Sequence, residues 1–326
     1  MSSSRTTKTL SLLMVETIES PALPVSLRSA LVQVVSQCNF RCSHCSQAAP
    51  HTSDERVNGV GLIDLKKRLE ELVVRGLRRV RFTGGEPLLH PHLPVLVRYA
   101  GSLGLDTSIV TNGSLLPRIA DRLIDAGLSA LWISLYGPTH ASYASVAYRN
   151  PPSSSHASMI SLFSSRGVKV GLYCAVDLGL PNLGLSLVSQ LAEGLSQIKF
   201  LQMMEQGRNL SLATAPRVLN DGALLEIARF KSSHPEIEVS VSMRSGQRRD
   251  FERMGFRVPE LVGCTLGMPD SWSIDANGNP EPCCLMMGRQ ANPRSATGSH
   301  HGCPAMPEYD IRERGEFICP LVYATA

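Results

Sequence analysis

The sequence predicts an α/β fold: a partial (β/α)6 barrel followed by a small, irregular, cysteine-rich domain that holds a metal cluster. Short β-branched runs alternate with stretches of helical periodicity from about residue 30 to about residue 230. Six such runs with intervening helices indicate a parallel sheet wound by right-handed crossovers. Near residue 245 the alternation stops, and the chain becomes rich in Gly, Pro, Cys and His. Strict repetition favours the barrel over an open doubly wound sheet, but periodicity is compatible with both.

Each expected strand is a short apolar or β-branched run, and helical stretches lie between the strands. The strands are expected at residues 31–35, 78–83, 106–111, 130–136, 168–176 and 197–204. In the stretch 61–76, apolar residues recur at helical spacing, and Gly76 is placed to end the helix. Gly101, Gly127 and Gly167 stand where later helices should give way to strands. In either architecture, the side chains that follow the strands meet at one rim.

Three segments are expected along the chain. Residues 1–29 form an N-terminal extension, residues 30–215 the barrel, and residues 216–326 a linker helix with the cysteine-rich domain. Within the last segment, residues 288–302 have the composition of a flexible loop. Because such a segment can hardly build a core by itself, a bound metal is the expected means of ordering it.

The composition is typical of a soluble globular protein, with 43% hydrophobic and 18% charged residues. The net charge of +4 is too small and too scattered to indicate nucleic acid as the main partner. No run of about 18 apolar residues occurs, so a membrane-spanning segment is not expected. The N-terminal residues lack the apolar length and the cleavage pattern of a secretory signal. The protein is therefore expected in the cytoplasm.

Nine cysteines in a long chain without a secretory signal indicate a reducing compartment, where clustered cysteines bind metal or carry out redox chemistry. Cys174, alone in an apolar stretch, is expected in the core. Cys38, Cys42 and Cys45 follow the first strand with the spacing C-x3-C-x2-C, which lets one loop hold three corners of an iron–sulfur cube. A structural zinc site usually takes four ligands from two separated pairs, and a two-cluster ferredoxin has a different spacing.

Three further motifs follow the next strands in order. TGGEPL (83–88) follows the second strand, TNG (111–113) the third and SLYG (134–137) the fourth. Two glycines let the backbone approach a ligand closely, and Glu86 offers an acceptor for an ammonium group. Each motif alone is compatible with an ordinary turn. Their succession after the cysteine triplet places all four motifs on one rim.

In this combination the sequence resembles the radical S-adenosylmethionine (SAM) superfamily over about residues 30–215. The resemblance implies that Cys38, Cys42 and Cys45 hold three irons of a [4Fe–4S] cluster, whose remaining iron binds SAM. It also implies cofactor contacts from His44, Gly84, Gly85, Glu86, Asn112, Ser134 and Gln202. The GGE segment would receive the methionyl amino group. At the position of His44 the family usually has an aromatic residue against the adenine, so histidine is a mild departure.

A second group of cysteines lies near the other end of the chain, at Cys264, Cys283, Cys284, Cys303 and Cys319. The pattern C-x13-G-x4-C from Cys264 to Cys283 resembles the opening of the SPASM or twitch auxiliary-cluster domain. A β-hairpin is expected between these two cysteines, around Gly278. The implied ligands of a second iron–sulfur cluster are Cys264, Cys283, Cys303 and Cys319, with Cys284 as a spare or a replacement. Zinc is the alternative occupant.

The resemblance implies that an electron from the cluster cleaves SAM to methionine and a 5′-deoxyadenosyl radical, which abstracts hydrogen from an unactivated carbon. The predicted reaction is oxidation, epimerisation or decarboxylation of a small molecule, such as a sugar, cyclitol or nucleoside, in natural-product biosynthesis. Tyr136, Glu205 and Arg208 lie near strand ends and are the candidate catalytic residues. An electron donor such as flavodoxin or ferredoxin is the expected partner.

Two alternatives to this function remain open. Peptide-modifying relatives often begin with a leader-binding domain of about 80 residues. Only 37 residues precede Cys38, which favours a small-molecule substrate over a peptide delivered by a separate partner. The other alternative is a non-catalytic iron–sulfur protein. The intact triplet and GGEP disfavour it, because a structural cluster would have its fourth ligand supplied.

Overall fold

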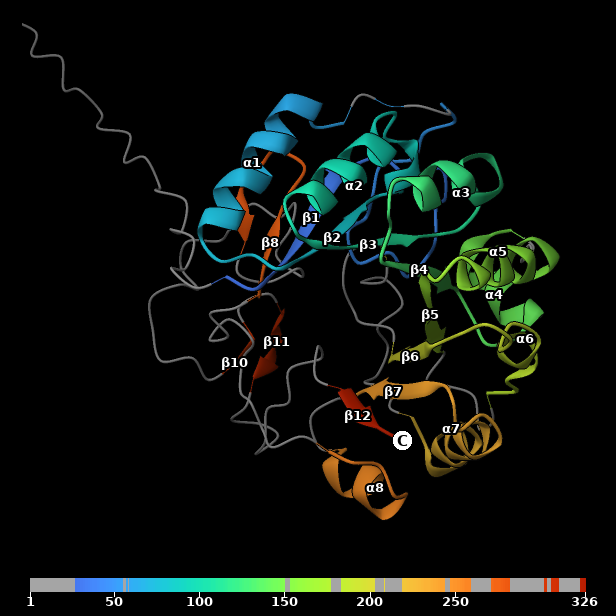
Figure 1. The fold of residues 1–326 in the computed structure, drawn as a ribbon. Helices are drawn as coiled ribbons and strands as arrows, with labels where there is room; N and C mark the ends of the chain where they lie inside the picture. Colours follow the sequence, from blue (N-terminus) through green and yellow to red (C-terminus); the bar gives the residue numbers. More distant parts are fainter. Residues whose placement is uncertain are drawn as a thin grey trace, which may run out of the picture.

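The computed structural model is built around one parallel sheet (Figure 1). It describes residues 27–54, 57, 59–149, 153–176, 183–202, 208, 219–243, 247–258, 271–281, 302–303, 306–310 and 323–326. The strand order of the sheet is β12-β7-β6-β5-β4-β3-β2-β1-β8-β9. Neighbouring strands from β7 to β8 in this order pair in parallel, and β9 and β12 add antiparallel edges. This arrangement confirms the predicted partial barrel.

The sheet strands are short and come at regular intervals along the chain. They are β1 (Ser29–Val35), β2 (Arg79–Gly84), β3 (Asp106–Thr111), β4 (Ala130–Leu135), β5 (Lys169–Val176), β6 (Gln197–Gln202), β7 (Glu238–Ser242), β8 (Ser271–Ile274), β9 (Pro280–Glu281) and β12 (Tyr323–Thr325). A separate antiparallel pair consists of β10 (Gly302–Cys303) and β11 (Met306–Asp310).

Helices connect the strands and cover the outer face of the sheet (Figure 1). They are α1 (Leu62–Val74), a 3-10 turn η1 (Pro87–Leu89), α2 (Leu93–Ser102), α3 (Leu116–Asp125), α4 (His140–Ala147), α5 (Ser153–Ser165), α6 (Ser186–Gln190), α7 (Asp221–Ser233) and α8 (Arg248–Arg253). In α1 the leucines at helical spacing, Leu65, Leu69 and Leu72, are the buried ones. Their stripe faces the core as the sequence pattern predicts.

The six predicted strands are β1 to β6, each within two residues of the expected bounds over the described part of the chain. One predicted helix end is wrong. Gly101 lies inside α2, and the turn after this helix falls at Gly104, whose φ is +77°. The chain leaves the helix there because a glycine without a Cβ enters the left-handed region at little cost. No helix in the described ranges has the length and apolarity needed to cross a bilayer.

Large side chains lie on the face of the sheet that points into the barrel. Trp132 and Tyr173 stack with ring centroids 4.6 Å apart, and Arg81 Nη1 donates to Tyr173 Oη at 2.7 Å. Because β2 and β5 have two strands between them, this contact requires the sheet to curl toward itself. A Cβ on Gly171 would lie 2.6 Å from the Trp132 ring, so the missing side chain leaves the room that the indole occupies.

The hairpin expected between Cys264 and Cys283 is present as β8 and β9. Asp275 holds its turn, since Asp275 Oδ1 accepts from the backbone nitrogens of Asn277 at 2.9 Å and Asn279 at 2.7 Å. Gly278 has a φ of +85°. The hairpin does not stand apart from the barrel: β8 pairs in parallel with β1, the strand that leads to the cysteine triplet.

Candidate functional site

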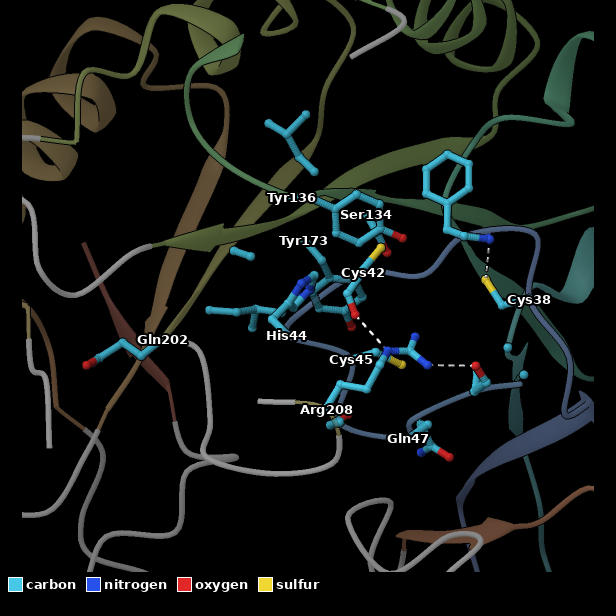
Figure 2. A pocket seen from close by; sticks show the side chains of 18 residues that line it. Cys38, Cys42, His44, Cys45, Gln47, Ser134, Tyr136, Tyr173, Gln202 and Arg208 are labelled. Carbon is cyan, nitrogen blue, oxygen red and sulfur yellow. Dashed lines mark hydrogen bonds between the residues drawn. The ribbon is translucent and has the colours of Figure 1, made fainter. Parts of the chain in front are cut away.

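A cavity of about 240 Å³ opens at the carboxyl ends of the strands (Figure 2). The loop after β1, here called the cysteine loop (residues 36–52), forms one side, and β4, β5 and β6 form the other. The predicted site residues that line the cavity are Cys38, Cys42, His44, Cys45, Gly84, Gly85, Ser134, Tyr136, Gln202 and Arg208. The rim therefore brings together residues more than 160 positions apart in the chain.

The structure describes only some of the remaining predicted residues. Glu86 and Asn112 are buried next to the cavity lining. Glu205, Cys264, Cys283, Cys284 and Cys319 lie outside the described residues. Cys303 is described only through its backbone, in β10. The auxiliary site thus stays a prediction, apart from its hairpin.

The cysteine loop is closed at its base by backbone pairing. Cys38 N donates to Pro50 O at 2.8 Å, and Thr52 N donates to Cys38 O at 2.9 Å. Inside the loop, tight turns follow, in which Cys45 N donates to Cys42 O at 3.3 Å. The backbone nitrogen of Phe40 donates to Cys38 Sγ at 3.3 Å. This closure fixes the three thiols on one side of a shared cavity.

Burial makes thiolates unfavourable at this site when nothing compensates for their charge. It raises the pKa of Cys38 to about 12, with the charge of Glu86 adding to the effect. It raises the pKa of Cys42 to about 12 as well, with Cys38 and Cys45 adding and Arg208 opposing. Thiolates are the form that binds metal, and bound metal supplies the missing positive charge. The donor set therefore fits a cationic metal cofactor.

The arrangement of the thiols also fits a cluster. Across the described ranges, no three His, Cys, Asp or Glu side chains form a group that could hold a single metal ion. A [4Fe–4S] cluster makes a different demand, because each iron takes its own thiolate. Three cysteines spaced around one cavity meet that demand.

Aromatic side chains form the wall beside the cysteines. The Tyr136 ring lies 5.2 Å from the His44 ring, 6.0 Å from the Phe40 ring and 5.4 Å from the Tyr143 ring, between centroids. Burial, with a smaller effect of the Arg208 charge, lowers the pKa of His44 to about 4. His44 is therefore neutral at pH 7, and its buried Nδ1 has no hydrogen-bond partner within the described part of the chain.

Glu86 ties the ends of two strands together. Its Oε1 accepts from Thr111 Oγ1 at 2.6 Å and from Leu88 N at 3.0 Å, and its Oε2 accepts from Asn112 N at 2.7 Å. The side chain is fully buried. The carboxyl group thus joins the turn after β2 to the end of β3. Its predicted contact with the methionyl amino group stays a prediction.

The Glu86→Gln substitution should change how stability depends on pH. Burial raises the pKa of Glu86 to about 7, although the hydrogen bonds from Thr111, Asn112 and Leu88 oppose this. Between the ordinary carboxyl pKa of about 4.3 and pH 7, the folded chain binds more protons than the unfolded chain. This contribution to stability is full at low pH and is lost as pH rises through 7.

We expect the difference in unfolding free energy, parent minus Glu86→Gln, to fall by roughly 3 kcal/mol between pH 4 and pH 8. Urea unfolding of the metal-free proteins at several pH values measures it. The lowered pKa of His44 makes the stability of both proteins rise with pH, opposite to the effect of Glu86. Taking the difference between the two proteins cancels this contribution. A difference that stays constant between pH 4 and pH 8 would contradict a raised pKa of Glu86 in the folded chain.

The Gln202 side chain lies on the β6 side of the cavity, across from the cysteines (Figure 2). Its Nε2 donates to Ser242 O at 2.6 Å and to Gln247 Oε1 at 2.8 Å. The Ser242 carbonyl can only accept, so the amide nitrogen must face it. Among the residues that the structure describes, the buried Oε1 has no hydrogen-bond partner.

Sequence reasoning missed Phe40 and Tyr173, which both line the cavity. Phe40 lies within the cysteine motif. Tyr173 lies in a strand that was predicted. Side chains two positions apart in a strand point to the same face, and Tyr173 and Ala175 both line the cavity, so this alternation could have identified Tyr173. Arg208 was predicted near the site, but its contacts with the cysteine loop have no signature in the sequence.

Comparison with known proteins places this site in a family. Residues 32–193 match the model of the radical SAM superfamily. The chain is 39% identical over 121 residues to a GTP 3′,8-cyclase of Chlorobaculum tepidum, which is 36% of each protein. It is 29% identical over 183 residues to a GTP 3′,8-cyclase of Campylobacter jejuni subsp. doylei, covering 53% of this chain and 55% of the relative. The chain thus covers between about a third and about half of these relatives' length.

Two solved structures share the fold. Streptococcus suis SuiB bound to the precursor peptide SuiA superposes with a TM-score of 0.60 and 14% identity, covering 82% of this chain and 61% of SuiB. The structure of anSMEcpe with bound AdoMet superposes with a TM-score of 0.54 and 15% identity, covering 89% of this chain and 80% of anSMEcpe.

Proposed function

Because this chain belongs to the radical SAM superfamily, we propose that it uses a [4Fe–4S] cluster and SAM to abstract hydrogen from a carbon atom of a small, nucleoside-like substrate. The observation that carries the proposal is the meeting of Cys38, Cys42 and Cys45 with the GGE turn around one cavity. When bound, the reduced cluster and SAM supply the radical that removes the hydrogen atom.

In this proposal, the three cysteines hold three irons and leave the fourth open to SAM. Gly84 and Gly85 let the turn after β2 pack directly against the cysteine loop, where side chains would collide with the carbonyls of Val35 and Gln37. Ser134 and Gln202 line the part of the cavity that would receive the ligands. Tyr136 and His44 form a wall that excludes water.

The sequence relatives support the proposed substrate class. The relatives with 39% and 29% identity are both named for a reaction of GTP. The peptide-bound SuiB shares the fold at 14% identity, which is support for the architecture and not for a peptide substrate. Among the predicted classes of sugar, cyclitol and nucleoside, the nucleoside-like class is therefore the best supported. The reaction outcome we propose is an oxidation or a rearrangement at that substrate's carbon.

We further propose that the C-terminal cysteines Cys264, Cys283, Cys303 and Cys319 hold an auxiliary iron–sulfur cluster. The β8–β9 hairpin supports this, since it lies between the first two of these residues. Its pairing with β1 anchors that part of the chain to the strand that carries the SAM cluster loop.

Formation of 5′-deoxyadenosine tests the function. We expect the anaerobically reconstituted parent, given SAM and dithionite, to form it, because reductive cleavage of SAM needs only the cluster and an electron. Cys42→Ala is expected to form none above background, since it removes one of three iron ligands. Cys174→Ala is the matched control, because this thiol is fully buried in β5 and does not line the cavity. A parent that holds iron yet forms no 5′-deoxyadenosine would support the non-catalytic alternative instead.

A further inference from the structure

Arg208 connects two loops from distant strands of the open sheet. It lies beyond the end of β6, whereas the cysteine loop follows β1, and four strands lie between β1 and β6. Arg208 Nε donates to Cys42 O at 2.9 Å, and Nη1 donates to Ala49 O at 2.8 Å. Its backbone nitrogen donates to Cys45 O at 3.1 Å. These bonds hold the cysteine loop at its second and third cysteines and at Ala49, near the end of the loop (Figure 2).

The contact matches the geometry of an arginine side chain. Carbonyl oxygens only accept, and a guanidinium offers donors in a rigid planar fork that reaches two carbonyls at once. A lysine ammonium places all its donors on one nitrogen at the end of a flexible stem, so it does not reproduce the two separate donor positions of the guanidinium fork. The guanidinium also brings a permanent positive charge to within hydrogen-bonding distance of the Cys42 carbonyl.

We propose that Arg208 is a positioning residue that clamps the cysteine loop in its cluster-bearing shape and raises the reduction potential of the cluster. This inference rests on the proposed function, because it takes Cys38, Cys42 and Cys45 as iron ligands. Reduction adds one negative charge to the cluster, and a nearby cation stabilises the reduced state in a partly buried site, where solvent screens the charge less than at the surface. The clamp and the charge are two separable effects of one side chain.

Three substitutions separate them. Arg208→Gln removes the charge and the fork, Arg208→Lys keeps the charge without the fork, and Arg208→Ala removes both with the side chain. Arg149→Gln is the matched control, since Arg149 Nη2 donates to Asn39 O in the same loop at 3.3 Å from an exposed position. At that position solvent and salt screen its charge.

Two measurements on the reconstituted full chain test the proposal. Iron release to an anaerobic chelator should be at least about tenfold faster in all three Arg208 variants, as for other residues that support metal ligands. The midpoint potential from an EPR-monitored dithionite titration should become more negative in Arg208→Gln and stay near the parent value in Arg208→Lys. Arg149→Gln should match the parent in both. Urea unfolding of the metal-free variants separates these effects from a general loss of folding.

Two results would overturn the proposal. Parent-like iron release in Arg208→Lys and Arg208→Gln rules out the clamp, and a parent-like potential in Arg208→Gln rules out the effect of charge. If the parent itself takes up no iron, both the proposed function and this inference fail. If the parent holds its cluster and the Arg208 variants match it in iron release and midpoint potential, only the inference about Arg208 is overturned.

Discussion

The Cys38/Cys42/Cys45 triple alanine variant is expected to hold about four fewer irons per chain than the reconstituted parent. The three thiols line one cavity, and the charges of Cys38 and Cys45 add to the effect of burial in raising the pKa of Cys42. Removing them leaves a buried pocket with no soft ligand, so no cluster can assemble there. Iron and sulfide counts on anaerobically reconstituted protein measure the change, and zinc is quantified in the same samples.

The total iron count of the parent distinguishes an iron–sulfur cluster from zinc as the occupant of the C-terminal site. About eight irons falling to about four means that a second four-iron cluster is present. About four irons falling to none, with one zinc remaining, means that the C-terminal cysteines hold a structural metal. Cys174→Ala should leave every count unchanged, because its thiol is enclosed in the core. An unchanged iron count in the triple variant would remove the basis of the proposed function.

The barrel was predictable from the sequence because its signals are local. Each of β1 to β6 is a short apolar run of its own, and α1 carries a leucine stripe that needs no partner to be recognised. β7 was not predicted, because its sequence has no continuous apolar run. Its sequence EVSVS includes Ser240 and Ser242, which are buried although they are polar. Ser242 is buried because it bonds Gln202 from β6 through both its backbone carbonyl and its hydroxyl group.

The candidate site was predictable in its ligands but not in its supports. The cysteine triplet and the GGE turn are contiguous motifs. By contrast, the partners of Glu86 lie 25 and 26 residues away, in Thr111 and Asn112. The contact of Arg208 with Cys42 spans 166 residues. Such pairings are set by how the sheet curls, which one sequence does not encode in any local pattern.

Gly85→Ala should be among the most damaging small substitutions in the chain. The turn after β2 is bonded closely to the loop after β1, with Gly85 N donating to Val35 O at 3.0 Å and Glu86 N donating to Gln37 O at 2.9 Å. A Cβ on Gly85 would lie 2.2 Å from Gln37 O and 2.6 Å from Ser36 O. Both obstacles are backbone atoms, so the loop itself must move. Gln37 precedes the first cysteine, and its displacement should also reduce cluster uptake.

The expected cost is about 3 kcal/mol of unfolding free energy, near the upper end for overpacking, and urea unfolding at constant m-value measures it. Gly101→Ala is the matched control: it lies in α2, and its added Cβ would meet nothing within 4 Å. There, helix propensity predicts a gain of up to about 1 kcal/mol. Because both substitutions restrict the unfolded chain equally, the gap between the two variants isolates the steric effect. Equal urea midpoints and equal iron contents in the two variants would mean that the contact between the GGE turn and the cysteine loop can accommodate a methyl side chain.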